Sequence, residues 1–126
     1  MDPRDQARQI AIVSAYSSIV RTSDMKSNPS NGTVVADTGS LSGGFYDVII
    51  FMSSNCALGD NNLRAEWRND ANTGNVQYWE YYTSTSLTFL ITLPGIYINS
   101  SERFRLYVQT GFTGLVAGSI TCIRRA

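Results

Sequence analysis

The sequence predicts a small antiparallel β-sandwich of about eight strands. Apolar and polar residues alternate strictly in Arg103–Gln109, where Phe104, Leu106 and Val108 share one side. Successive side chains of a strand point to opposite faces, so this pattern indicates one face in a core and one in water. Clusters of Gly, Asn, Asp and Ser separate further short apolar runs from Thr33 onward. No helical pattern alternates with these runs, which argues against a parallel α/β fold.

An N-terminal arm and linker of residues 1–32 is expected to precede a sandwich formed by residues 33–126. Pro3 suits the first position of a short helix, with an aspartate before it as a cap. Residues 10–20 are rich in β-branched residues and serine, so helix and strand are both open there. Residues 21–32 contain an Asn-Pro-Ser-Asn-Gly run and are interpreted as a linker.

The sandwich strands follow in short runs bounded by turn residues. They are predicted at Thr33–Asp37, Phe45–Met52, Leu63–Arg68, Val76–Thr83, Leu87–Leu93, Arg103–Gln109 and Leu115–Arg125.

The strand Phe45–Met52 differs from the others because it is apolar on both faces. Its two sides are Phe45, Ile49 and Phe51, and Tyr46, Val48, Ile50 and Met52. A strand of this kind must be covered on both sides. One cover is the opposite sheet, and the other is the N-terminal segment or a second copy of the chain. This strand therefore predicts an oligomer.

Composition bounds the possible partners. The 126-residue chain is long enough for one domain and has a formal net charge of zero, so no nucleic-acid partner is indicated. No secretion signal or membrane-spanning run is recognised, and a cytosolic site of synthesis is expected. Cys56 is expected in a loop and Cys122 in the core, without metal-type spacing, and a bond between them is disfavoured in a reducing compartment.

The residues that most catalytic and metal sites need are missing. The chain has no histidine, which removes the commonest general base and the usual zinc and iron ligands. Glu66 and Glu80 are the only carboxylate pair on neighbouring predicted strands, but Arg64 and Arg68 flank Glu66 and favour an ion-paired surface. We therefore predict no catalytic residue, no metal site, no cofactor and no enzymatic activity.

The aromatic run Gln77–Tyr82 has three interpretations. The first places Trp79 and Tyr81 inward and leaves Tyr78 and Tyr82 at the surface. The second is a protein interface, and the third is a sugar-binding site, because exposed rings serve both.

The order of strands resembles that of a known family. Gly43-Gly44 before a two-faced strand, and the ending formed by Glu102–Thr110 and Ala117–Arg125, resemble small jelly-roll domains over residues 33–125. In particular, the chain looks like the trimeric, tumour-necrosis-factor-like jelly rolls that serve tailed bacteriophages as head decoration (cement) proteins.

The resemblance implies roles for particular residues. It places three strands near a threefold axis: Phe45–Met52, Leu87–Leu93 and Leu115–Ile123. The subunit contact that it implies is formed by Tyr46, Val48, Ile50 and Met52. The contacts that it implies with the capsid or another partner are Arg4, Arg8, Ile12 and Tyr16.

The resulting hypothesis is a virion structural protein, assembled in the host cytoplasm, that decorates and stabilises a capsid as a homotrimer. Its partners would be its own copies and the major capsid protein or another virion protein, with no nucleic acid and no membrane. The alternative is a carbohydrate- or receptor-binding module of a phage tail or a similar assembly.

Overall fold

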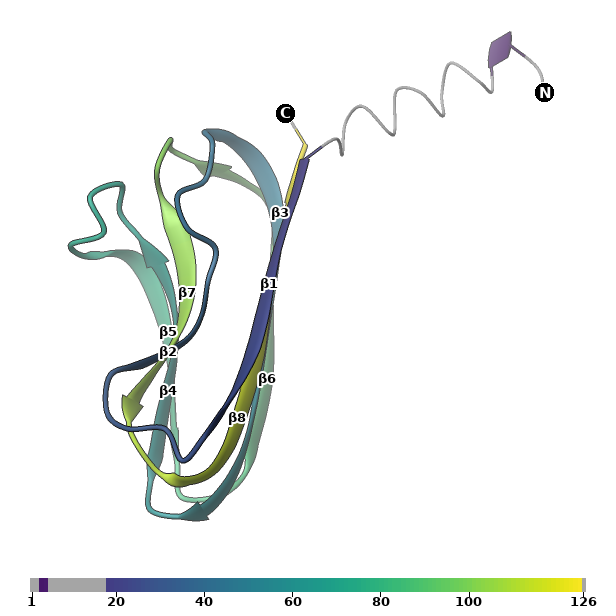
Figure 1. The fold of residues 1–126 in the computed structure, drawn as a ribbon. Coiled ribbons are helices and arrows are strands. Elements are labelled where there is room, and N and C mark those ends of the chain that lie inside the picture. The colour runs from purple at the N-terminus through teal and green to yellow at the C-terminus, as the bar shows by residue number, and fades with distance from the viewer. Residues whose placement is uncertain (1–2, 5–17, 126) are drawn as a thin grey trace.

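The structure is a computed structural model, and it describes residues 3–4 and 18–125. The described residues form two four-stranded antiparallel sheets that face one another (Figure 1). Sheet A has the strand order β1-β8-β3-β6, and sheet B has the order β2-β7-β4-β5. The strands are β1 (Ser18–Ser27), β2 (Thr33–Asp37), β3 (Gly44–Leu58), β4 (Asn61–Arg68), β5 (Asn75–Thr83), β6 (Leu87–Ile98), β7 (Arg103–Thr110) and β8 (Thr113–Arg124).

This strand order is that of a jelly roll. Apart from the β4–β5 hairpin, every connection between consecutive strands crosses from one sheet to the other. All neighbours are antiparallel, and the first and last strands lie side by side in sheet A. The predicted all-β sandwich of about eight strands is therefore confirmed, and the jelly-roll topology with it.

The first strand corrects the predicted division of the chain at residue 32. Residues 18–27 form β1, and all ten of them pair with β8. The inward side of β1 carries Val20 but then Thr22, Asp24 and Lys26, so it lacks the apolar alternation that identifies a strand from sequence. Inward charges are typical of edge strands, which must not pair with other chains. The sandwich thus includes residues that were predicted as a linker.

Two other strands are longer than predicted. β3 continues to Leu58, so Cys56 lies in a strand and not in a loop. β6 continues past Pro94-Gly95 to Ile98, with a register irregularity in its pairing with β3. β6 is an edge strand, where a proline is tolerated because one side of the strand needs no ladder hydrogen bond.

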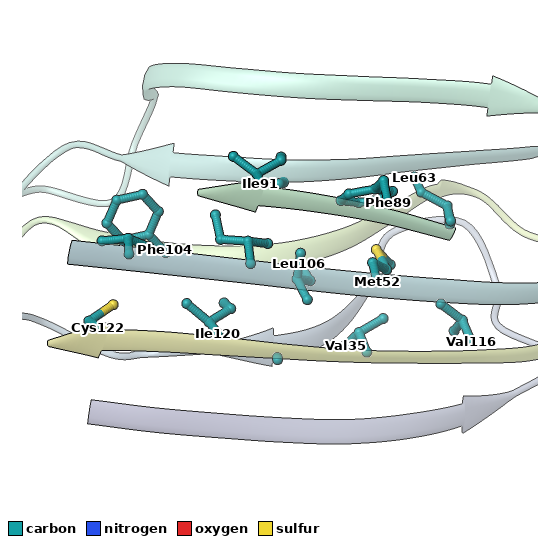
Figure 2. Packing of buried hydrophobic residues seen from close by; sticks show 14 of the residues in the cluster. Val35, Met52, Leu63, Phe89, Ile91, Phe104, Leu106, Val116, Ile120 and Cys122 are labelled. Carbon is teal, nitrogen blue, oxygen red and sulfur yellow. The ribbon is translucent and has the colours of Figure 1, made fainter. Parts of the chain in front are cut away.

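The core lies between the sheets and collects the inward row of each strand. Phe104, Leu106 and Val108 of β7 are fully buried, as their alternation predicts. Figure 2 shows Leu106 among side chains from both sheets, including Met52 and Ile120. Cys122 is also fully buried, forms no disulfide bond and packs as a small core residue.

The implied subunit contact is wrong. Tyr46, Val48, Ile50 and Met52 lie in this core and are each 2% exposed or less within a single chain. Their partners are inward residues of β8 and β6, for example Ile120 and Ile91 opposite Ile50. Side chains enclosed in this way cannot meet a second subunit.

Candidate functional site

The outward side of sheet A carries many exposed apolar side chains and is called here the apolar face. It includes large hydrophobic side chains from all four strands of the sheet. Its exposed members are Ile19, Met25, Phe45, Ile49, Phe51, Leu90, Tyr97 and Leu115. Monomeric proteins rarely leave so many apolar side chains together on one surface without a function.

The strand register brings these side chains together. Phe51 of β3 lies opposite Leu90 of β6, and Phe45 lies opposite Tyr97. The rings of Phe45 and Tyr97 meet edge to face, with centroids 5.1 Å apart. Cross-strand pairs of this kind stabilise a sheet and also form a firm surface for a partner.

Charged side chains interrupt the apolar face at Asp47 of β3 and at Arg21 of β1. Asp47 accepts a hydrogen bond from the backbone nitrogen of Gly95 at 2.8 Å, and Arg125 lies 3.5 Å from its carboxylate. The outward positions of β3 that follow are Ile49 and Phe51, which are uncharged. Around Phe51, whose cross-strand neighbours are Ser119 and Leu90, a partner can cover the face without desolvating a charge.

The outward side of sheet B has the opposite character and is called here the polar face. Its centre is Glu66, which is only 2% exposed although it points away from the core. Arg105 of β7 donates from Nε to its Oε1, and Asn75 of β5 donates to its Oε2 at 2.9 Å. The guanidinium of Arg105 also lies 4.7 Å from the ring centroid of Tyr107.

Glu80 completes the network on β5. It accepts hydrogen bonds from Arg64 Nε at 2.9 Å and from Asn62 Nδ2 at 3.0 Å. Arg64 also lies over Tyr78, with its guanidinium carbon 4.3 Å from the ring centroid. The Arg64 Nη1 lies 3.9 Å from Glu66 Oε2. Both carboxylates of the pair named from the sequence are thus engaged by arginines. Arg64 is one of the two that flank Glu66, whereas Arg68 donates to Asn72 and Asn75 instead.

The aromatic run on β5 follows the first of its three interpretations. Trp79 and Tyr81 pack against the core, where the ring of Tyr81 stacks on Phe89 at 4.2 Å. Tyr78 and Tyr82 point outward and are 51% and 63% exposed. The Tyr82 hydroxyl donates a 2.6 Å hydrogen bond to Asp60, and this bond raises the pKa of Tyr82.

The residues implied as capsid contacts are mostly outside the described chain. Arg4 is described and exposed, whereas Arg8, Ile12 and Tyr16 lie outside the described residues. The sequence identified the two-faced strand but assigned its enclosed face to the subunit contact. The other members of the apolar face lie on β6, β8 and β1. In the sequence, these exposed apolar residues are scattered singly.

Neither a metal site nor a membrane helix is found in the parts of the chain that the structure describes. Residues 3–4 and 18–125 hold no group of three or more Cys, Asp or Glu side chains placed to bind a metal ion. The same residues form no helix long and apolar enough to span a membrane.

Comparisons with known proteins add little. No protein family and no curated protein matches the sequence. A chain of the Glycosylation Associate Protein (Gap123) complex from Streptococcus agalactiae is similar in structure, with a TM-score of 0.39 and 14% sequence identity. The similarity covers 98% of this chain but only 29% of that chain. A likeness this weak carries no argument about function.

Proposed function

We propose that the protein acts by binding and not by catalysis, as an oligomeric structural component of a virion that decorates and stabilises a capsid. The observation that carries the proposal is the apolar face of sheet A. In the described chain, nothing covers this face, and its members come from four strands of one rigid sheet. A surface of this kind favours a permanent protein contact over transient exposure to water.

The magnitude of the effect supports association. Burying a Leu, Ile or Phe side chain completely contributes about 1.5–3 kcal/mol, so a half-exposed one retains about 1 kcal/mol to be gained. Eight such side chains on each of two copies therefore offer on the order of 16 kcal/mol as an upper limit. Association costs about 4–15 kcal/mol in lost freedom, so two apolar faces together can offset it.

A second copy of the chain is the partner that fits this face best. The part of the face around Phe51 and Leu90 has no charge that requires an opposite charge on a different protein. Copies of the chain would cover one another's apolar side chains, which a polar partner would leave unmatched. We propose a homotrimer, with sheet A of each subunit near the threefold axis.

The capsid contact belongs to the same proposal. Arg4 and the neighbouring positions Arg8, Ile12 and Tyr16 remain the proposed contacts with a capsid protein. Arginine suits this role because its planar group hydrogen-bonds and stacks at protein interfaces.

The oligomeric state in solution tests the proposal. Sedimentation equilibrium of the wild-type protein should give three chain masses at micromolar concentration. Ile49→Asp on the apolar face should give a monomer that retains a native β-sheet circular dichroism spectrum. Val34→Asp is the matched control, because Val34 is 38% exposed on sheet B and Ile49 is 40% exposed on sheet A. A monomeric wild type, or dissociation by both substitutions alike, contradicts the proposal.

Capsid binding needs a separate measurement. Wild-type protein should co-sediment with empty capsids of the encoding virus. Arg4→Glu should lower the bound fraction while the oligomeric state stays the same. A bound fraction that does not change with this substitution removes Arg4 from the contact, and no co-sedimentation of the wild type contradicts the capsid role.

A further inference from the structure

We propose that the β5 side of the polar face is a binding site for a neutral oligosaccharide. The site consists of Tyr78, Glu80 and Tyr82 on β5, with Arg64 and Asn62 beside them on β4. It lies on sheet B, whereas the proposed self-association uses sheet A, so each proposal can fail without the other.

The two tyrosines supply flat apolar surfaces. Tyr78 and Tyr82 are four residues apart on one strand, so they share a side and lie roughly 13 Å apart. Tyr82 is 63% exposed, yet its hydroxyl is held by Asp60, so the ring has a fixed position without being covered. Exposed, oriented rings of this kind stack on the apolar faces of sugar rings.

Hydrogen-bonding groups lie between the two rings. Glu80 is the outward residue midway between them, and its partly exposed carboxylate is held by Arg64 and Asn62. A carboxylate has about four acceptor sites, so two protein donors leave room for ligand hydroxyls. Sugar recognition needs such a combination of an apolar surface with a few placed polar groups.

Asn62 gives an independent indication of a missing partner. Its side chain is 92% buried, as its 8% exposure implies, and its Oδ1 has no hydrogen-bond partner among the described residues. A buried polar atom without a partner is unfavourable and requires an explanation such as strain or an unseen water or ion. Asn62 lies directly opposite Tyr82 in the β4–β5 pairing.

The charge distribution favours a neutral ligand. Three of the four arginines of the polar face already contact carboxylates, in the pairs Arg105–Glu66, Arg64–Glu80 and Arg103–Asp37. The fourth, Arg68, donates to Asn72 and Asn75. A nucleic acid or an acidic glycan would have to break these pairs to bind its own charges. A neutral polyhydroxyl chain can instead accept from the arginines and donate to the carboxylates while the pairs remain.

The site is also ordered before any ligand binds. Buried Glu66 fixes Arg105 on one side, and Arg64 is held between Glu80 and the ring of Tyr78. Ordering such long side chains on binding normally reduces affinity, and here they are ordered already.

Titration calorimetry with a set of neutral hexasaccharides tests the proposal. The probes are the gluco-, xylo-, manno- and N-acetylglucosamine hexamers, with hexagalacturonate as the acidic comparison. The wild-type protein should bind at least one neutral hexamer and should not bind hexagalacturonate. Tyr82→Ala and Tyr78→Ala should each weaken that binding by about tenfold.

Tyr97→Ala is the matched control, because Tyr97 is also about half exposed but lies on sheet A. It should leave the affinity for the hexamer unchanged. Asn62→Asp should weaken binding as well, because it removes a donor to Glu80 and adds a charge. The proposal is overturned if no neutral hexamer binds, if only hexagalacturonate binds, or if Tyr97→Ala weakens binding as much as Tyr82→Ala.

Discussion

Ile49 and Ile50 are adjacent on β3 and have opposite environments. Ile50 is 1% exposed in the core, and Ile49 is 40% exposed on the apolar face. The same substitution to alanine at both positions therefore separates the contribution of the core from that of the outer surface. Any difference between the two variants comes from position and not from chemistry.

The expected magnitudes follow from burial. Ile→Ala removes three carbons, which corresponds to about 2.4 kcal/mol of transfer free energy when the side chain is fully buried. At Ile50 the rigid surroundings from both sheets leave a cavity, which raises the loss in unfolding free energy to about 3–4 kcal/mol. At Ile49 part of the side chain already meets water and no closed cavity forms, so about 1 kcal/mol is expected.

Urea denaturation gives both values. The unfolding free energies should be measured at low and at high protein concentration, because association stabilises the native state by mass action. Ile50→Ala should lose the same amount at both concentrations. Ile49→Ala should lose more at high concentration, where the wild type gains stability from association.

Two results would refute this reasoning. Equal losses for the two variants at low concentration would mean that the two sides of β3 are not as different as their exposure indicates. A loss for Ile49→Ala that does not depend on concentration would mean that the apolar face contributes nothing to association.

Three further predictions concern other parts of the fold. Gly114→Ala should lower the unfolding free energy by about 3 kcal/mol or more, because an added Cβ would lie 1.9 Å from a backbone oxygen of β3. Gly39→Ala, also at positive φ but with open space around it, should lose only about 1–2 kcal/mol in the same urea titration, and equal losses would contradict the close approach. Burial raises the pKa of the Cys122 thiol to about 12, so iodoacetamide at pH 8 should label Cys56 in the native protein and Cys122 only after unfolding. Because the folded pKa lies above the ordinary thiol value of 9.0, the stability from the neutral Cys122 thiol is complete below pH 9 and falls as the pH rises towards 12. Fast native labelling of Cys122 would argue against its burial. Glu66→Ala should cost about 3 kcal/mol in urea denaturation because it leaves mostly buried arginines without their carboxylate, and a loss below about 1 kcal/mol would show that the network is solvated.

Most of the sandwich could be predicted from residue alternation. A period of two identifies a half-buried strand, and it placed Phe104 and its neighbours in the core correctly. The same pattern separated Glu66 and Arg64 from the inward row of β4. β1 was missed because an edge strand with inward charges has no apolar row to detect.

The polar face could be predicted only in part. The arginines beside Glu66 in the sequence indicated an ion-paired surface, and this is what β4 and β5 form. The stronger partner of Glu66 is Arg105, which is 39 residues away in the sequence. Strand pairing alone brings these two side chains together, and no local spacing reveals it.

The alternation along residues 45–52 shows that β3 is apolar on both sides and that one sheet can cover only one of them. Which side is enclosed depends on the packing of the two sheets, because alternation assigns residues to two faces without saying which face is inward. The inward rows of β6 and β8 enclose Ile50 and leave Ile49 outside. That choice depends on the packing of strands far apart in the chain, and it moves the proposed interface to the opposite side of the same strand.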